Sequence, residues 1–239
     1  AVKRQLCRWA SEMNRIPTYD ARMAPPRTYR VRVLGCRVNH AERREVESVL
    51  RDRGLKEAVP GRPADLEIVH TCSVTGRAAA KSRQAARRAK ESHNSTLLLT
   101  GCLVGSNRDQ AELLTGNPSH AIGHDLPMPL AVASWFDAQW ANENQNPCPK
   151  VEESILPLPL AAMPNQPANH VRAEVRIQDG CDAHCTFCII PTTRPVLRTK
   201  SISTVTEEVE RLVDLGHREV VLAGIFLGAF GHETALRRR

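Results

Sequence analysis

The sequence lacks any apolar run that approaches the length of a membrane span. A transmembrane helix needs about 20 consecutive apolar residues, and the apolar stretches of this 239-residue chain are much shorter. Residues 1–15 are basic and contain no apolar core of the kind that a secretory signal peptide carries. We therefore expect a soluble, intracellular protein of the cytoplasm that is not attached to a membrane.

Aromatic residues are also scarce, with two Tyr, four Phe and three Trp. The sequence therefore does not predict an aromatic platform on which nucleic-acid bases would stack. Cationic residues instead exceed anionic ones, 33 Lys and Arg against 26 Asp and Glu, which gives a formal net charge of +7. This excess is compatible with an anionic partner such as nucleic acid, although charge alone does not identify one.

Cysteine is plentiful, with eight residues and no secretory signal. Disulfide frameworks are typical of secreted chains, whereas clustered cysteines in a reducing compartment indicate metal or redox chemistry. Cys7 and Cys148 lie in segments without a regular pattern and match no motif. The functional argument therefore depends on the other six.

The first half of the chain alternates between strand-like and helix-like segments. Residues 1–27 have little periodicity and are interpreted as an N-terminal extension, and the alternation occupies residues 28–141. Strands are predicted over 29–36, 65–72 and 95–102, and helices over 40–54, 76–92, 109–116 and from 129 onward. This order is typical of an α/β domain with a doubly wound parallel sheet.

Six prolines between positions 147 and 167 predict that residues 142–170 form a linker. After it the pattern predicts a strand over 171–180, a helix over 203–216 and a strand over 218–225. Residues 171–239 are therefore interpreted as the opening of a second α/β domain.

Cys181, Cys185 and Cys188 form a C-x3-C-x2-C motif in the loop after a predicted strand. Three thiolates on a short loop can hold three irons of a 4Fe-4S cluster and leave the fourth iron open to a small molecule. A structural zinc site with His184 as the fourth ligand is the alternative. We favour the cluster because zinc sites more often use paired C-x2-C motifs.

A second set of cysteines comprises Cys36, Cys72 and Cys102, each at the end of a predicted strand. The carboxyl ends of parallel strands lie along one edge of a sheet, where ligands bind. Three thiolates converging there would suit a second cluster with an open iron. The alternative is that they are small buried residues that fill the ends of the strands.

Together the two sets and their flanking residues resemble the methylthiotransferase family of radical S-adenosylmethionine enzymes. The resemblance rests on LGCRVNHAE at 34–42, HTCSVTGRAAAKSR at 70–83, LTGCL at 99–103, RIQDGCDAHCTFCIIP at 176–191 and EEVERLVDLGHREVVLAGIFLGAFG at 207–231. Its GCRVN and GIFLGAFG segments are most similar to the branch that modifies C2 of N6-threonylcarbamoyladenosine at position 37 of tRNA. Related branches modify isopentenyladenosine in tRNA or an aspartate of ribosomal protein uS12.

The resemblance implies two 4Fe-4S clusters and S-adenosylmethionine as cofactors. The set at Cys36 would hold the auxiliary cluster involved in sulfur transfer, and the set at Cys181 the cluster that generates the radical. Phe187 would lie beside the adenine of the cofactor, while Gly224 and Gly228 would let the backbone approach it closely. The implied partners are tRNA, through adenosine 37 of the anticodon loop, and an electron donor such as a flavodoxin-type protein. No acid-base catalytic residue is assigned.

Two further features carry hypotheses. Asn39 matches a family position near the auxiliary cluster, but we expect it to act as the N-cap of the helix that follows. The predicted helix after Cys72 carries six cationic residues, and phosphate contacts to tRNA and an ordinary solvated face are both open interpretations. These residues are Arg77, Lys81, Arg83, Arg87, Arg88 and Lys90.

The chain departs from the family in two respects. A complete α/β barrel needs about 200 residues or more, and residues 171–239 have room for only part of one, so we expect a truncated radical domain. On that basis the chain alone would not be a competent enzyme, and a non-catalytic metal-binding or RNA-binding protein is the alternative. Pro195 also stands where the family more usually has a glycine-containing stretch.

Overall fold

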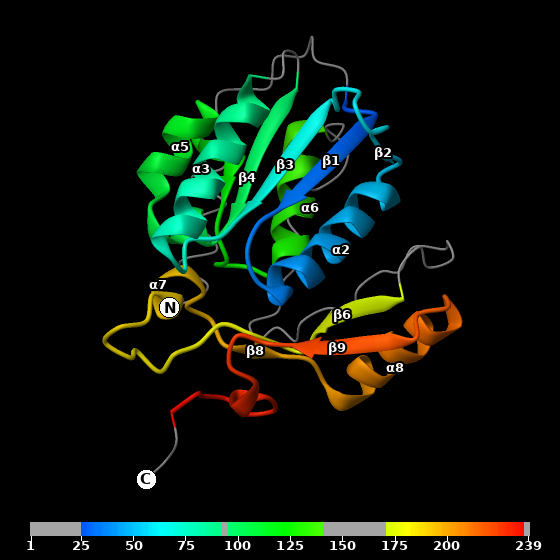
Figure 1. Ribbon diagram of the computed structural model, residues 1–239, viewed down its shortest axis with the longest axis vertical. Helices are drawn as coiled ribbons and strands as arrows, with labels where there is room; N and C mark the ends of the chain where they lie inside the picture. The colour runs from blue at the N-terminus through cyan, green and yellow to red at the C-terminus, as the bar shows by residue number, and fades with distance from the viewer. Residues whose placement is uncertain (1–24, 92–94, 141–170, 237–239) are drawn as a thin grey trace.

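The computed structural model describes residues 25–91, 95–140 and 171–236 of the chain. The predicted linker at 142–170 and almost all of the predicted extension at 1–27 lie outside these ranges, as do Cys7 and Cys148. The described residues form a sheet covered by helices, with a second and smaller unit of strands and helices beside it (Figure 1).

The larger unit is built on five parallel strands in the order β2-β1-β3-β4-β5. Their bounds are β1 Thr28–Val33, β2 Lys56–Glu57, β3 Leu66–Thr71, β4 Thr96–Gly101 and β5 Ala121–Ile122. The three long strands are those that the sequence predicts. The sequence pattern did not predict β2 and β5, because two-residue strands at the sheet edges leave no periodicity to detect.

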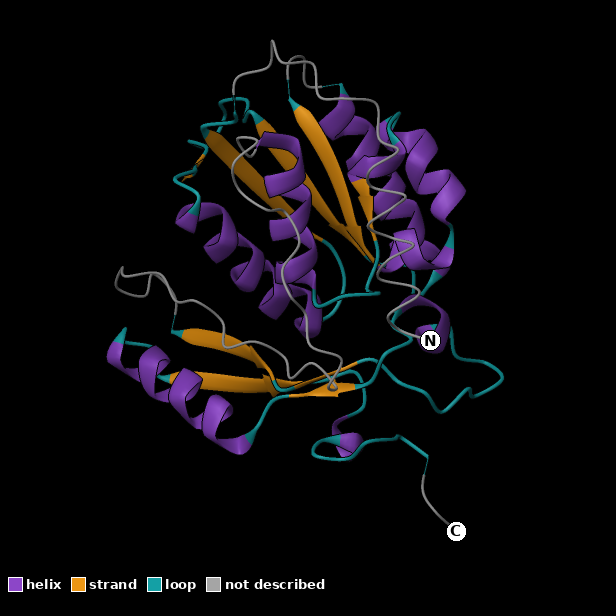
Figure 2. Cartoon of the chain, turned by 180° about the vertical axis from the view of Figure 1, so that it is seen from behind, coloured by secondary structure: helices purple, strands orange, loops and turns teal. Residues whose placement is uncertain are grey.

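Helices cover both faces of this sheet, as in a doubly wound domain (Figure 2). One face packs on α2 (Arg37–Asp52) and α6 (Met128–Trp140), around a core that contains Leu50, Ile68 and Trp135. The other face packs on α3, α4 and α5, around a smaller core that contains Val69 and Leu99. The bounds on this face are α3 Gly76–Lys90, α4 Cys102–Ser106, α5 Arg108–Thr115 and η1 Pro118–His120. The predicted doubly wound α/β domain is therefore confirmed, and the opening of a barrel in the second unit stays a prediction.

The smaller unit follows the predicted order of strand, helix and strand. Parallel strands β6 (Arg172–Arg176) and β9 (Glu219–Ala223) are connected through α8 (Ile202–Asp214). Val205, Val209 and Leu212 are spaced so that they face one side of α8, and they pack against β6. The remaining elements are β7 Gln178–Asp179 paired with β8 Arg198–Thr199, α7 Ile190–Thr193 and η2 Leu227–Ala229.

The two units pack against each other through α2 and β6 and through α4 and α7. A Cβ added at Gly105 in α4 would lie 2.9 Å from the Cα and carbonyl oxygen of Thr193 in α7, so a side chain would separate these helices. Within the described ranges, no helix combines the length and apolar character needed to cross a membrane.

We expect Leu98→Ala to lower the free energy of unfolding by about 2–5 kcal/mol, because Leu98 is fully buried in the core between β4 and the α2–α6 layer. Leu113→Ala makes the same chemical change on α5, where the side chain is 81% exposed, and should alter stability by less than about 0.5 kcal/mol. Urea denaturation followed by circular dichroism measures both. Equal losses would show that Leu98 does not occupy a packed core.

Candidate functional site

Cys36, Cys72 and Cys102 follow β1, β3 and β4, which are adjacent strands of the parallel sheet. The register pairs Val33 with His70 and Thr71 with Gly101, so the three chain segments reach the carboxyl edge at the same level. Cys36 is exposed, whereas Cys72 and Cys102 are 5% and 3% exposed. The expected convergence at one sheet edge is what the structure shows, and the role of the thiols as ligands stays a prediction.

Two glycines make this convergence possible. Gly35 has a φ of +112°, and a Cβ there would lie 2.7 Å from the Cβ of Cys72 and 3.0 Å from its Sγ. Gly101 has a φ of +96°, and a Cβ there would lie 2.5 Å from the carbonyl oxygen of Thr71. Because only glycine adopts such conformations at low cost, these residues let the strand ends turn in close contact.

Asn39 connects the strand ends to one another. Its amide nitrogen donates to the carbonyl oxygens of Leu34, at 2.7 Å, and Thr71, at 3.0 Å. Its amide oxygen lies 3.7 Å from the Sγ of Cys36 and accepts a hydrogen bond from Arg194. The expectation that Asn39 is the helix N-cap is wrong. Helix α2 begins one residue after Cys36, which is the N-cap, and the side chain of Asn39 points to neighbouring strand ends.

Cys181, Cys185 and Cys188 lie on the loop between β7 and α7. Gly180 starts this loop with a φ of +71°, and a Cβ there would lie 2.0 Å from the carbonyl oxygen of Val196. The backbone N–H of Cys181 donates to the carbonyl of Arg194, and that of Cys188 donates to the carbonyl of Cys185. Cys185 is exposed and the other two are partly exposed. The loop is thus held at its base and open at its tip.

Asp182 fastens the same loop to the end of the described chain. Its carboxylate accepts hydrogen bonds from the hydroxyl of Thr234 and the backbone N–H of Ala235, both at 2.7 Å. Burial raises the pKa of this carboxyl, but the two hydrogen bonds outweigh burial and leave the pKa below its usual value.

The residues predicted to approach S-adenosylmethionine lie near this loop. Phe187, between the second and third cysteine, is 91% exposed. Gly224 follows β9, and a Cβ there would lie 2.7 Å from Leu227 and 3.1 Å from Gln178. Gly228 packs against the ring of Phe226, 3.2 Å from where its Cβ would be. A side chain at either glycine would therefore displace a neighbouring side chain of the protein, and the role of both glycines beside a cofactor stays a prediction.

The geometry of the thiols bears on the kind of metal centre that they suit. Two ligands of a single zinc ion lie no more than about 4.6 Å apart, twice the Zn–S bond length. In the described part of the chain, the only three ligand atoms that approach within 4.8 Å of one another belong to Glu42, His70 and His124. Neither thiol set is thus arranged around one ion. Three thiolates are the donors that a polynuclear cluster uses, each on a different iron, and such a cluster stays a prediction for both sets.

Glu42, His70 and His124 do not themselves suit a metal ion. The Glu42 carboxylate already accepts hydrogen bonds from two guanidinium groups, whose charges oppose a cation. His70 is engaged at both ring nitrogens, with Glu42 at 3.0 Å and the hydroxyl of Thr100 at 2.7 Å. This trio belongs instead to an ion cluster that joins the two units.

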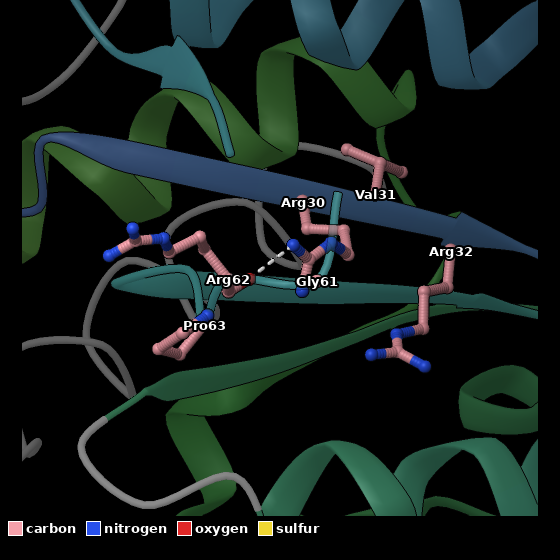
Figure 3. A pocket seen from close by; sticks show the side chains of 6 residues that line it. All are labelled: Arg30, Val31, Arg32, Gly61, Arg62 and Pro63. Atoms are coloured by element: carbon pink, nitrogen blue, oxygen red, sulfur yellow. Dashed lines mark hydrogen bonds between the residues drawn. The ribbon is translucent and has the colours of Figure 1, made fainter. Parts of the chain in front are cut away.

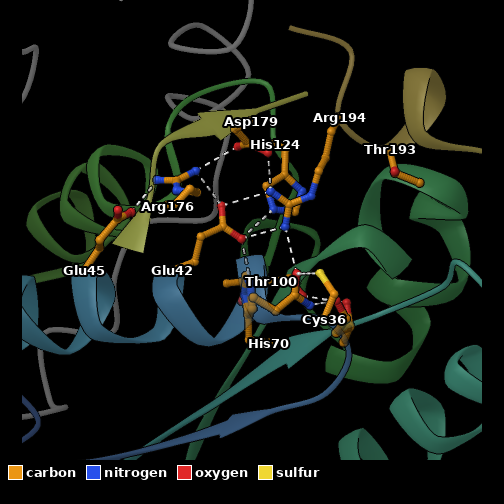
Figure 4. Close-up of polar contacts among 12 residues, drawn as sticks. Cys36, Glu42, Glu45, His70, Thr100, His124, Arg176, Asp179, Thr193 and Arg194 are labelled. Atoms are coloured by element: carbon orange, nitrogen blue, oxygen red, sulfur yellow. Dashed lines mark hydrogen bonds and ion pairs between the residues drawn. The ribbon is translucent and has the colours of Figure 1, made fainter. Parts of the chain in front are cut away.

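The buried ion cluster consists of Glu42, His70 and His124 from the larger unit and Arg176, Asp179 and Arg194 from the smaller one (Figure 4). All six are at most 2% exposed. Arg194 donates to Glu42 and to Asp179, each at 2.6 Å. Arg176 donates to the same two carboxylates at 2.9 and 2.7 Å. Each carboxylate is therefore shared by two guanidinium groups.

These contacts fix the charge states of the cluster. Burial alone would raise the pKa of Glu42, but Arg194, His124 and Arg176 hold it well below its usual value. Burial lowers the pKa of His124, and the charge of Arg194 lowers it further. Glu42 is thus ionised and His124 neutral near pH 7.

Arg194 connects the cluster with the first thiol set. Burial raises the pKa of the Cys102 thiol, and the neighbouring Arg194 guanidinium opposes that rise. Arg194 also donates to Asn39 at 2.9 Å, while its carbonyl accepts from Cys181. One residue therefore contacts both cysteine-bearing regions.

Sequence reasoning did not identify the ion cluster. Glu42 lies on a helix rich in charge, and its partner Arg176 is 134 residues away along the chain. One local signal was available in the sequence of α2. Glu42 and Glu45 stand next to Ala41 and Val46, at positions that face the packed side of the helix.

Residues 28–123 match a family described as "Uncharacterized protein family UPF0004". The chain is 30% identical over 203 residues to "Threonylcarbamoyladenosine tRNA methylthiotransferase MtaB" of Bacillus subtilis, covering 84% of this chain and 44% of that protein. It is 26% identical to "tRNA-2-methylthio-N(6)-dimethylallyladenosine synthase" of Erythrobacter litoralis, covering 89% and 47%. The chain thus spans less than half the length of these relatives.

A second synthase of this kind, from Mycobacterium marinum, is 30% identical over 226 residues, which cover 90% of this chain and 40% of that protein. The aligned lengths exceed the 28–123 family match in each case, so the similarity extends into the unit that carries the second thiol set.

We expect Glu42→Gln to lower the free energy of unfolding by about 3–5 kcal/mol, because it leaves Arg176 and Arg194 with too little negative charge in a buried site. Glu112→Gln is the matched control, since Glu112 forms an i,i+4 pair with half-exposed Arg108 and should contribute less than about 1 kcal/mol. Urea denaturation compares the two. Similar stabilities would mean that the buried ion cluster does not hold the units together.

We also expect stability to fall as the pH drops from about 7 to 5.5. Burial lowers the pKa values of His120 and His124 in the folded chain, so below about pH 6.5 the unfolded chain binds protons that the folded chain does not. Each histidine then contributes a loss of at most about 1.4 kcal/mol per pH unit. Urea denaturation at several pH values should show a shallower dependence for His124→Gln and an unchanged one for the exposed control His232→Gln. An unchanged dependence in His124→Gln would contradict the assignment.

Proposed function

The chain belongs to the methylthiotransferase family, and on that premise we propose that it carries the cluster-binding part of a tRNA methylthiotransferase. The observation that supports this most directly is the placement of two thiol sets around Arg194, one at the carboxyl edge of the sheet and one on the loop after β7. We assign residues 28–141 to the methylthiotransferase N-terminal domain, 142–170 to a linker and 171–239 to part of a radical S-adenosylmethionine domain.

The proposal assigns one 4Fe-4S cluster to each thiol set. Cys36, Cys72 and Cys102 would hold the auxiliary cluster. The second set, Cys181, Cys185 and Cys188, would hold the cluster that binds S-adenosylmethionine. When bound, these groups supply the electron that cleaves S-adenosylmethionine to a radical, and the sulfur that is transferred. Three thiolates for each cluster leave one iron free for an exchangeable ligand.

The protein residues then perform binding and positioning. The open tip of the second loop, with exposed Cys185 and Phe187, leaves room for a nucleoside-containing cofactor to approach. Gly224 and Gly228 would limit the bulk of the wall beside it. Burial of Cys72 and Cys102 limits the access of water to two of the three thiols of the first site, and the fixed charge of Arg194 partly offsets the rise in the pKa of Cys102 that burial causes.

For the substrate, we propose C2 of N6-threonylcarbamoyladenosine at position 37 of tRNA. The name of the Bacillus subtilis relative specifies threonylcarbamoyladenosine, and the other relatives are named for another modified adenosine of tRNA. The C2–H bond is neither acidic nor attached to a leaving group, so proton transfer alone cannot activate it and a radical is required. An electron donor such as a flavodoxin-type protein would supply the reducing electron.

The test is the iron and sulfide content of the full chain after anaerobic reconstitution. We expect about eight irons per chain, falling to about four when Cys36, Cys72 and Cys102 are all changed to alanine, and likewise for Cys181, Cys185 and Cys188. The matched control changes Cys7 and Cys148, which belong to neither set, and should keep about eight.

Each outcome is decisive for one assignment. If only one triple variant loses all of its iron, the chain holds a single cluster, and the thiol set changed in that variant binds it. The other thiol set would then be structural. Zinc in place of iron and sulfide would contradict the radical chemistry altogether.

A further inference from the structure

Helix α3 stands out in its charge. It carries six cationic residues and no carboxylate over Gly76–Lys90. Arg77, Lys81, Arg87, Arg88 and Lys90 are exposed, and none of the six forms an ion pair with another residue in the ranges that the structure describes. By comparison, α2 mixes both signs, and Glu42, Glu45 and Glu47 on it form ion pairs. Six uncompensated cations on one helix repel one another, so the helix is suited to an anionic partner.

The six cations of α3 divide between two sides of the helix. Arg83 reaches Gln110 of α5 at 3.5 Å, and the amine of Lys90 lies 3.2 Å from where a Cβ at Gly116 would be. At 100° per residue, Arg83, Arg87 and Lys90 therefore share the side toward α5. Arg77, Lys81 and Arg88 share the opposite side. Because α3 packs on β3 and β4, and α5 on β4 and β5, that opposite side faces β1.

On this side the face of β1 is hollowed rather than covered by a helix (Figure 3). The hollow has a volume of about 630 Å³ and is lined by β1 and the loop before β3. It contains three arginines, of which Arg30 and Arg32 project from β1 on the face opposite to buried Val31, and Arg62 comes from the loop. Glu67 beneath them is fully buried and pairs with Arg30 and Arg32, so the hollow keeps a net positive charge.

The hollow and helix α3 both lie close in sequence to cysteines of the first thiol set. Arg32 lies one residue before the end of β1, and Cys36 follows it by four residues along the chain. Helix α3 begins four residues after Cys72 and has Arg77 in its first turn. Arg32, Arg62, Arg77, Lys81 and Arg88, which we term the basic track, thus flank a path that ends at the first thiol set.

We propose that the basic track binds the phosphate backbone of RNA and guides it toward the cysteine-lined edge. The inference rests on the proposed function for its choice of RNA as the polyanion. A 15-residue helix is about 22 Å long, enough to meet several successive phosphates. The track contains no aromatic or large apolar side chain, so contact is to the backbone rather than to bases or to the interior of a lipid layer.

The experiment compares two triple variants of the full chain with the same loss of charge on the same helix. Arg77→Ala/Lys81→Ala/Arg88→Ala removes the track side, and Arg83→Ala/Arg87→Ala/Lys90→Ala removes the α5 side. Binding to a transcribed tRNA is measured by fluorescence anisotropy between 50 and 300 mM salt, with circular dichroism to verify folding and iron analysis in parallel.

We expect the track variant to weaken tRNA binding about tenfold or more at 100 mM salt. The slope of log K against log salt should fall by about two to three, one unit or slightly less for each lost phosphate contact. The α5-side variant should remain within about twofold of the unaltered chain. Equal weakening in both variants would reveal a general charge effect and overturn the proposal, as would stronger binding to phosphatidylserine vesicles than to tRNA.

Iron analysis separates this proposal from the proposed function. Normal iron content, together with tRNA binding that the track substitutions do not change, would overturn the proposal for the basic track. The cluster assignments would be unaffected. Absence of iron together with track-dependent tRNA binding would support the basic track and contradict the cluster assignments.

Discussion

Two guanidinium groups share two carboxylates inside this molecule, and the relation between its two units depends on that contact. Arg176 and Arg194 each donate to both Glu42 and Asp179, with all four groups almost completely removed from water. Burying such charges is costly unless each one is matched and hydrogen-bonded. Glu42 comes from α2 and the other three from the smaller unit, so moving the units apart would leave charges without partners. The arrangement favours one relative placement because only that placement satisfies every charge.

This placement determines how the two thiol sets are related. Arg194 uses its guanidinium to reach Asn39 and the neighbourhood of Cys102, while its carbonyl accepts from the backbone of Cys181. A displacement of Arg194 would therefore change the base of the second loop and the surroundings of the first set together. Close packing of Gly105 against Thr193, a few residues from Cys102 and Cys188, adds a steric constraint at the same junction. The relative position of the two thiol sets is thus determined by residues other than the cysteines themselves.

The sequence predicted the long elements and the convergence of three cysteines at one sheet edge, but it did not predict the junction between the units. The long strands and amphipathic helices were recognisable because their apolar residues repeat every two or every three to four positions. Cysteines at strand ends could be expected to converge because parallel strands share a carboxyl edge. The ion cluster joins residues up to 152 positions apart, and an arginine in sequence looks the same whether it is buried or solvated. Asn39 was misread for the same reason: its position after the strand suits an N-cap, but its partners come from other strands and from the second unit.

The division of charge between interior and surface links the fold to its proposed role. Six carboxylates but only four cationic side chains are buried among the described residues, so the positive surplus of the chain, formally +7, lies outside the core. The buried carboxylates Glu42 and Glu45 of α2 form ion pairs with Arg176 of the smaller unit. Helix α3, on the other face of the sheet, carries cationic side chains and no carboxylate. The exposed cations of α3 therefore lie on the sheet face that α3, α4 and α5 cover. That face borders the same carboxyl edge as the first thiol set, and a polyanion attracted to it would be delivered beside the cysteines without any contribution from aromatic stacking.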